Sequence, residues 1–136
     1  MKDLRIIIAG GRNFNDFNLL RKETNRIIKM IVSTKIPKEC VTVISGGARG
    51  ADVLGEKYAE MYGIKLHKIP ANWERYGNMA GYIRNREMAK FAAGIDEEGD
   101  RPRGVLIAFW DGQSHGTKHM IETAKNLKLD VYVVGY

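Results

Sequence analysis

The stretch that decides the fold is Val41–Asp52, with the sequence VTVISGGARGAD. It begins as a run rich in β-branched residues, which predicts a strand ending at Ser45, and a helical pattern starts near Gly50 or Ala51. A strand, a glycine turn and a helix in this order present free backbone N–H groups to an anion at the helix N-terminus. The stretch therefore predicts an α/β unit with an anion site at its turn.

Strand-like and helix-like segments alternate along the whole chain. Short apolar runs predict five strands, at Leu4–Ala9, Val41–Ser45, Ile64–Ile69, Val105–Trp110 and Val131–Val134. Apolar residues at helical spacing predict the intervening helices, at Leu20–Val32, from Gly50 or Ala51 to Gly63, at Tyr82–Ala93 and around Met120–Leu127. The alternation predicts one domain over residues 1–136, an α/β/α sandwich of three layers with a five-stranded parallel sheet in the order 3-2-1-4-5.

This strand order brings three glycine turns to one edge of the sheet. The turns follow Ala9, Ser45 and Trp110, and such sheets bind ligands where the strand order reverses. We therefore expect the three turns to form one ligand site. Its expected members in the first two turns are Gly10, Gly11 and Arg12, and then Ser45, Gly46, Gly47, Arg49, Gly50 and Asp52.

Composition indicates a globular protein, and its net positive charge suits an anionic partner. The net charge is +6 and 44% of the residues are hydrophobic, but basic and acidic residues are interleaved, so a solvated basic surface accounts for most of the charge. No apolar run approaches the roughly 18 residues of a membrane span. The single cysteine, Cys40, excludes an internal disulfide and fits a reducing cytosol, so we expect a cytoplasmic location and no membrane partner.

Two familiar nucleotide motifs are absent. A dinucleotide dehydrogenase needs GxGxxG after its first strand and an acidic residue at the end of its second. Here the first turn reads GGRNF and the second strand ends in Ser45-Gly46. No GxxxxGK followed by Ser or Thr is present either, so ATP hydrolysis by a P-loop is excluded.

Side chains near the predicted turns suit phosphate and a base. Guanidinium groups bind phosphate in bidentate fashion, hydroxyls donate hydrogen bonds, and aromatic rings stack on a base. The candidates in these three groups are Arg12, Arg49 and Arg84, then Ser45, Ser114 and Thr117, and then Trp73, Tyr76 and Trp110. Packing in the core or at its rim is the alternative for each tryptophan. Arg49, a cation near a helix start, is unfavourable there by roughly 0.3–1 kcal/mol unless an anion binds.

Two segments have neither helical nor strand periodicity. Residues 70–81, PANWERYGNMAG, form a long connection that we expect to be irregular and functional. Residues 94–104, GIDEEGDRPRG, form a polar loop that we expect to be the most mobile surface segment.

Three motifs in order resemble one protein superfamily. They are GGARGAD after the second strand, PANWERYGNMAGYIRNREMA after the third and SHGTKHMIETA after the fourth. They resemble the SLOG superfamily, and within it the small single-domain YspA-like, cpYpsA-related branch of bacteria and phages. The superfamily also includes the DNA-processing protein A and the LOG-type phosphoribohydrolases. The resemblance extends from Ile6 to Val134 and implies a Rossmann-like domain that binds nucleotides or nucleotide-derived signals.

The resemblance also implies roles for particular residues. The central ligand loop would be formed by Gly46, Gly47, Arg49, Gly50 and Asp52. The second phosphate-contacting turn would contain Gly116 and Thr117, and the facing helix would carry Arg84 and Asn85. The complete set of predicted ligand-binding residues is therefore Gly10, Gly11, Arg12, Ser45, Gly46, Gly47, Arg49, Gly50, Asp52, Trp73, Arg84, Asn85, Trp110, Ser114, Gly116 and Thr117.

An enzymatic alternative follows from the same resemblance. Some superfamily members cleave the N-glycosidic bond of nucleoside monophosphates, with an arginine on the third helix and a glutamate just after the glycine-threonine pair. Arg84 or Arg86 would supply the arginine, but the first acid after Gly116-Thr117 is Glu122. A carboxylate stabilises an oxocarbenium-like transition state or activates water, and Asp52 could substitute for the displaced glutamate or merely cap its helix. Catalytic candidates are thus Arg84, Asp52 and Glu122.

We expect binding, as sensing or sequestration of a nucleotide-derived phosphate ligand, rather than catalysis. A nucleoside-monophosphate N-glycosidase is the first alternative and single-stranded nucleic-acid binding the second. No cofactor is expected, and a homo-oligomer is expected because most soluble assemblies are symmetric. A metal site is not expected: His115, His119 and Glu122 have helical spacing, but Gly116-Thr117 indicates that the helix only begins there, which would leave His115 in the turn.

Overall fold

One parallel sheet organises the molecule. The computed structural model describes residues 3–32 and 37–136. The strands are β1 (Leu4–Gly10), β2 (Val41–Ser45), β3 (Lys65–Lys68), β4 (Arg103–Trp110) and β5 (Asp130–Gly135). They pair in parallel in the order β3-β2-β1-β4-β5. The predicted strand number, direction and order are confirmed, and β3 is an edge strand as expected.

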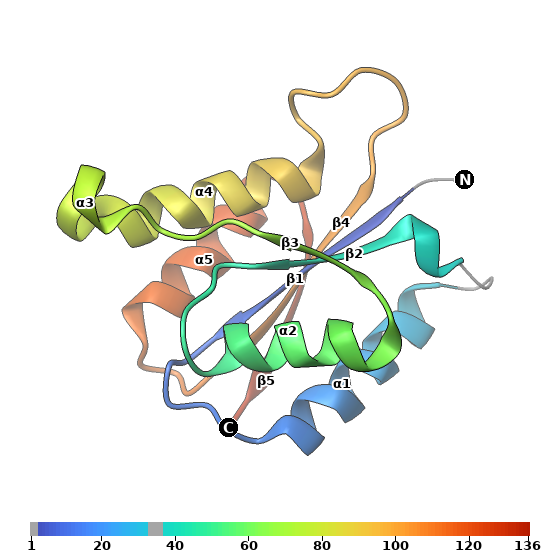
Figure 1. Cartoon of the computed structure of the whole chain (residues 1–136), viewed down its shortest axis with the longest axis horizontal. Helices are drawn as coiled ribbons and strands as arrows, with labels where there is room; N and C mark the ends of the chain where they lie inside the picture. The colour runs from blue at the N-terminus through green and yellow to red at the C-terminus, as the bar shows by residue number, and fades with distance from the viewer. Residues whose placement is uncertain (1–2, 33–36) are drawn as a thin grey trace.

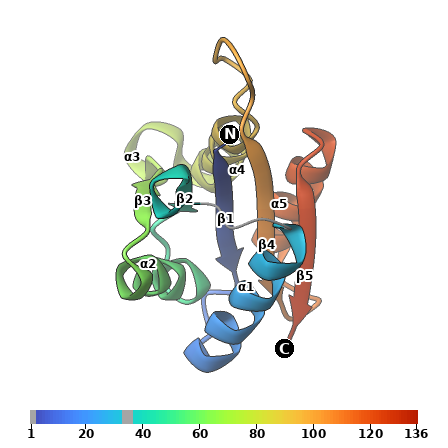
Figure 2. The same ribbon diagram turned by 90° about the vertical axis from the view of Figure 1, so that its right-hand side faces the viewer.

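Helices cover both faces of this sheet. They are α1 (Phe17–Ile31), α2 (Ala51–Tyr62), the short α3 (Trp73–Tyr76), α4 (Ala80–Ala93) and α5 (His115–Asn126), with 3₁₀ turns η1 (Lys38–Cys40) and η2 (Gly77–Met79). Figures 1 and 2 show α1 and α2 on one side of the strands and α4 and α5 on the other. This is the three-layer, Rossmann-like sandwich that the sequence predicted.

The two layers of helices make two hydrophobic cores, one on each face of the sheet. Along β1, Ile6 and Ile8 face the core of α1 and α2, whereas Ile7 and Ala9 face the core of α4 and α5. Because successive strand residues point to opposite faces, a strand covered on both sides is apolar at every position. The continuous apolar run that predicted β1 therefore has a direct structural cause.

Several predicted boundaries were wrong. The connection at 70–81 is not irregular throughout: the Asn72 side chain accepts a hydrogen bond from Arg75 N–H and caps α3. Helix α4 then begins at Ala80, two residues earlier than predicted. Helix α5 begins at His115, so His115 is helical rather than part of the preceding turn, because Ser114 caps the helix. The starts of α3 and α5 depend on single capping side chains, which apolar periodicity does not register, whereas no side chain caps α4.

The polar loop between α4 and β4 is attached to the sheet. It protrudes at the edge of the molecule opposite the C-terminal ends of the strands (Figure 1). Arg5 of β1 donates hydrogen bonds to both carboxylate oxygens of Glu97 and to the carbonyl oxygen of Phe91. This contact accounts for the one charged residue in the apolar run of β1.

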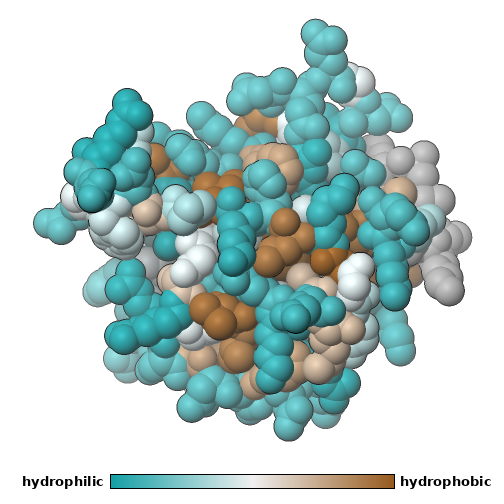
Figure 3. Space-filling model, viewed as in Figure 1, coloured by the Kyte–Doolittle hydropathy of each residue, from teal (hydrophilic) through white to brown (hydrophobic). Residues whose placement is uncertain are grey.

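Polar side chains cover most of the face seen in Figure 3, and apolar side chains gather near its middle. In the part of the chain that the structure describes, no helix is both long and apolar enough to cross a bilayer.

A small residue sets the distance between α2 and the sheet. Gly55 of α2 is buried against Ile8 of β1, and a Cβ atom added there would lie 2.8 Å from Ile8 Cγ2 and 2.9 Å from Ile8 Cβ. A helical glycine normally costs up to about 1 kcal/mol relative to alanine. At this position, however, the overlap with Ile8 outweighs that gain.

We therefore expect Gly55→Ala to lower the free energy of unfolding by about 1–3 kcal/mol, measured by urea denaturation. Gly135→Ala is the matched control, because a Cβ atom there meets no atom within 4 Å. The control should change the free energy of unfolding by no more than about 0.5 kcal/mol. A stabilising Gly55→Ala substitution would contradict this account of the packing.

Candidate functional site

A cavity of about 640 Å³ lies at the C-terminal ends of β1 and β4. Its walls are the turn after β1, the start of α2, helices α3 and α4 with the residues between them, and the turn that leads into α5. A neighbouring hollow of about 580 Å³ is bounded by Gly46, Gly47 and Pro70. The two share Arg12, Arg49 and other wall residues, so they form adjoining parts of one site.

The turn after β1 is bonded to the elements on both sides of it. Gly11 N–H donates to the carbonyl oxygen of Phe109 (3.1 Å), and the Gly11 carbonyl accepts from Ala51 N–H (3.2 Å). Gly50 has a φ of 82°, and a Cβ atom there would lie 2.3 Å from the Gly11 oxygen. Only glycine fits this position, which lets the turns after β1 and β2 touch.

Ser45 holds the second turn in place. Its hydroxyl donates to Glu56 Oε2 (2.7 Å) and accepts from Gly47 N–H (3.1 Å). Glu56 in turn forms an ion pair with Lys68 (3.2 Å). Ser45 is 1% exposed and borders neither part of the site, so its hydroxyl is engaged inside the protein.

Asp52 is a buried carboxylate in the wall of the larger cavity. It is 4% exposed, and its Oδ2 accepts a hydrogen bond from Ala48 N–H (3.2 Å). Burial raises the pKa of Asp52 to about 6, although the positive charge of Arg84 and the Ala48 hydrogen bond act in the opposite direction. Asp52 therefore stabilises the glycine turn after β2 through this hydrogen bond, and it also brings a titratable group to the cavity.

Arg84 reaches the same point from α4. Its Nη1 donates to the Gly46 carbonyl oxygen (3.3 Å), whereas its Nε is buried without a hydrogen-bond partner. Desolvation lowers the pKa of Arg84, and the carboxylate of Asp52 opposes that effect. Arg84 lines both parts of the site with a partly desolvated positive charge, and such a charge suits an anionic ligand.

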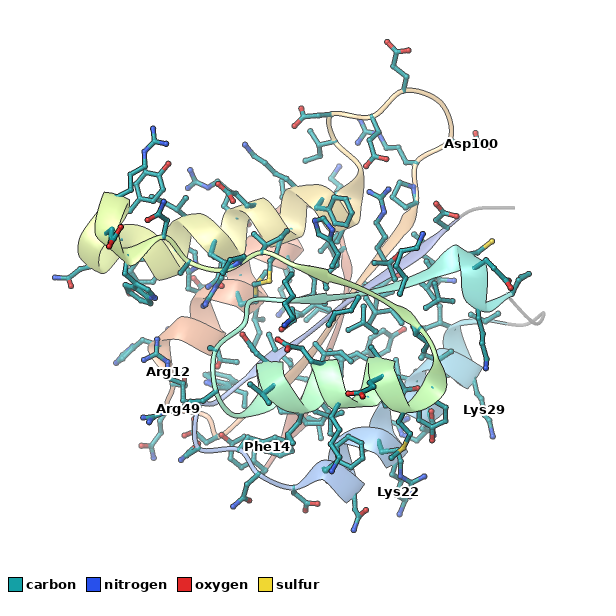
Figure 4. The ribbon with its side chains drawn as sticks, in the orientation of Figure 1. Arg12, Phe14, Lys22, Lys29, Arg49 and Asp100 are labelled. Carbon is teal, nitrogen blue, oxygen red and sulfur yellow. The ribbon has the colours of Figure 1, made fainter. Side chains whose placement is uncertain are left out.

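Two more guanidinium groups flank the opening. Arg12 follows β1 and Arg49 precedes α2, and both lie at the same end of the sheet (Figure 4). The Arg12 guanidinium lies 5.9 Å from the ring centre of Trp73, which is 50% exposed and borders both parts of the site. Neither arginine, nor Arg84, forms an ion pair with a carboxylate of the described residues.

The turn into α5 is closed by local hydrogen bonds. Ser114 Oγ accepts from Thr117 N–H (3.4 Å) and lies 3.1 Å from Thr117 Oγ1. Asp111 Oδ1 accepts from the N–H groups of Gln113 and Ser114 (2.9 Å each), which lowers the pKa of Asp111. Trp110 Nε1 donates to the Ser114 carbonyl oxygen (3.0 Å). Hydrogen bonds within the turn therefore hold its shape in the structure.

Most of the predicted residues are brought together. Those that line the larger cavity are Gly10, Gly11, Arg12, Arg49, Asp52, Trp73, Arg84, Asn85, Ser114, Gly116 and Thr117. Gly46 and Gly47 line the neighbouring hollow. The candidate residues that border neither are Ser45, Gly50, Tyr76, Arg86, Trp110 and Glu122. Glu122 is exposed on α5, lies 4.0 Å from Lys118 and borders neither part of the site.

Other wall residues were not predicted as site residues. Tyr82 and Met88 line the cavity from α4, and Met120 does so from α5. Helical spacing was the available signal, because Met88 follows Arg84 by four residues and Met120 follows Gly116 by four. Asp111 also borders the cavity, but its position was not detectable from periodicity. Within residues 3–32 and 37–136, no three His, Cys, Asp or Glu side chains are grouped as a metal site would require.

Comparison with known proteins places the chain in a family. The family model of YAcAr, described as the YspA, cpYpsA-related SLOG family, matches residues 4–76. The Gene 61 protein of Mycobacterium phage D29 is 32% identical over 140 residues, an alignment that covers 96% of each chain. No solved structure gives a significant match. With its parallel sheet and glycine turns, the chain belongs to the YspA, cpYpsA-related family of SLOG proteins.

Proposed function

We propose that the site binds a nucleotide or a nucleotide-derived phosphate ligand, which the protein senses or sequesters. The observation that carries this proposal is the set of three arginines, Arg12, Arg49 and Arg84, around one cavity with no carboxylate of the described residues in ion-pair contact. Membership of a SLOG family supports a nucleotide-related ligand.

The buried guanidinium of Arg84 favours an anion in particular. Its Nε has no partner, and its charge is partly desolvated. Nε itself is sealed from solvent, but Arg84 lines both parts of the site, so a phosphate oxygen at its terminal N–H groups would offset the desolvation with a charge-assisted hydrogen bond. The exposed groups of Arg12 and Arg49 would hold further phosphate oxygens from the other side.

The shape of the site supports a ligand larger than phosphate alone. A volume of about 640 Å³ lies within the usual range of small-molecule sites, about 300–1,000 Å³. The half-exposed ring of Trp73, with the Arg12 guanidinium above it, offers a surface on which a base can stack.

A second candidate function is hydrolysis of an N-glycosidic bond. It rests on Asp52, a buried carboxylate that lines the cavity and has a pKa of about 6. Such a group suits proton transfer near neutral pH. Two observations speak against hydrolysis. Asp52 Oδ2 already accepts a hydrogen bond from Ala48 N–H. Glu122 lies outside the cavity, and the carboxylate that the turn before α5 does bring to the cavity is Asp111, whose pKa is lowered.

The binding proposal is tested with a panel of nucleoside monophosphates, diphosphates and cyclic nucleotides in thermal-shift assays. A ligand present at 100 times its Kd should raise Tm by about 8 °C. Arg84→Gln should weaken binding of that ligand by about 10- to 100-fold in calorimetry, because a hydrogen bond to a charged group is lost.

The matched control for this experiment is Arg86→Gln. Arg86 is on the same helix but exposed and outside the cavity, so its substitution should leave the Kd within twofold of the original. Failure of every nucleotide to raise Tm would refute the proposal, and equal losses for both variants would show that Arg84 has no special role.

The two candidate functions differ in the fate of nucleoside monophosphates. For a binder, we expect no free base after prolonged incubation, measured by liquid chromatography. If base is released, the hydrolase is the correct assignment, and Asp52→Asn should abolish the release. If the protein only binds, Asp52→Asn should keep nucleotide binding, since the amide oxygen can still accept from Ala48 N–H.

Asp52 also predicts how stability without a ligand depends on pH. Its pKa is about 6 in the folded protein, against 3.8 for an unperturbed aspartate, so folding favours the protonated form. The protonated form of Asp52 contributes fully to the free energy of unfolding below pH 4, and this contribution is lost as the pH rises through 6. At pH 8, Asp52→Asn should therefore be more stable than the unmodified protein by about 1–3 kcal/mol.

That difference should shrink toward zero as the pH falls from 6 to 4, measured by urea denaturation at each pH. Asp111→Asn is a control for which we expect the opposite change in stability, because backbone hydrogen bonds lower the pKa of Asp111. The Asp111 variant should be less stable than the unmodified protein at neutral pH. A pH-independent effect of Asp52→Asn would refute this account of its charge.

A further inference from the structure

The side chain of Asn85 projects from α4 into the wall of the larger cavity and is 4% exposed. Its amide nitrogen, Nδ2, lies 3.3 Å from the carbonyl oxygen of Gly116 and 3.1 Å from Nδ1 of His119. Both partners belong to α5, so the amide links the two helices that form this side of the cavity.

These contacts determine which way the amide points. A backbone carbonyl oxygen can only accept a hydrogen bond, so the nitrogen of the Asn85 amide, and not its oxygen, must face Gly116. Burial lowers the pKa of His119, which keeps its ring neutral at neutral pH and able to accept at Nδ1. The two amide hydrogens of Asn85 are therefore both used inside the protein.

The oxygen of the same amide has no such partner. Asn85 Oδ1 makes no hydrogen bond with the described residues, and it is not among the atoms that are sealed from solvent without a partner. Because the residue is otherwise buried and lines the cavity, the open side of Oδ1 is the cavity itself. At this point the Asn85 side chain offers the cavity an acceptor.

This acceptor lies in a different setting from the arginines. Met88 follows Asn85 by about one turn of α4, and Met120 follows Gly116 by one turn of α5, and both line the cavity. A phosphate group carries oxygens that repel a carbonyl oxygen, and it would be poorly solvated beside two thioethers. The arginines suit phosphate, whereas Asn85 suits a neutral group that carries a hydrogen.

We propose that Asn85 Oδ1 is a specificity-determining acceptor for a hydrogen-bond donor of the ligand, a sugar hydroxyl or an amino group of the base. The proposal rests on the proposed nucleotide-binding function and deepens it, because it assigns the non-phosphate end of the ligand to this part of the cavity. A ligand without the matching donor leaves Oδ1 facing an apolar group, and such sites reject the analogue.

The test uses AMP and three analogues that each lack one donor: 2′-deoxy-AMP, 3′-deoxy-AMP and purine riboside 5′-monophosphate. All keep the phosphate. In calorimetry, the unmodified protein should bind one of the three about 10- to 100-fold more weakly than AMP. Which analogue is affected tells whether the donor is a sugar hydroxyl or the base amino group.

Variants connect this discrimination to Asn85. Asn85→Leu should bind AMP and the affected analogue with Kd values within threefold of each other, since the acceptor is gone. Asn126→Leu, an exposed asparagine at the far end of α5, should keep the full discrimination. If circular dichroism shows that Asn85→Leu does not fold, Asn85→Ala replaces it in the same comparison.

The outcomes separate this inference from the proposed function. Equal binding of AMP and all three analogues overturns the inference but leaves nucleotide binding intact. Discrimination that survives in the Asn85 variant also overturns it. If none of AMP, GMP, CMP and UMP binds, the proposed function fails for nucleoside monophosphates, and the inference fails with it.

Discussion

The carbonyl oxygen of Gly11 is the point on which the site depends. It accepts hydrogen bonds from Ala51 N–H and Phe14 N–H, which joins the turn after β1 to the first residue of α2. This approach is possible because Gly50 has no Cβ, and a side chain there would overlap the oxygen itself. Through this contact the parallel sheet places Arg12 and Arg49 beside one cavity (Figure 4).

The arrangement of charge behind these turns is costly in the absence of a ligand. Arg84 is partly desolvated with its Nε unpaired, and Asp52 is buried with a pKa raised to about 6. Neither charge gains an ion pair with the other within 4.0 Å. Buried charges of this kind lower the stability of the protein and are typical of functional sites, where they are held in position before a ligand binds.

The fold could be predicted from the sequence because its cause is local. A strand covered on both faces is apolar throughout, as in Ile6–Ala9, and the strand order then follows from the rules for parallel sheets. The sequence could not indicate which side chains of the site are engaged inside the protein, because apolar periodicity does not register side-chain hydrogen bonds. Ser45 has a hydroxyl at the right strand end, but Glu56 of α2 engages it. Trp110 likewise has its indole N–H bound to Ser114.

Asn85 shows most clearly what a sequence leaves open. Its place beside Arg84 on a helix that faces the site could be predicted, but an amide is both donor and acceptor. The orientation is decided by Gly116 and His119, about thirty residues later in the chain. Because these two acceptors take both amide hydrogens, the amide oxygen is the atom of Asn85 that is left for a ligand in the folded protein. In the binding mode that we propose, backbone geometry rather than residue type alone would separate the charged end of a ligand from its neutral end.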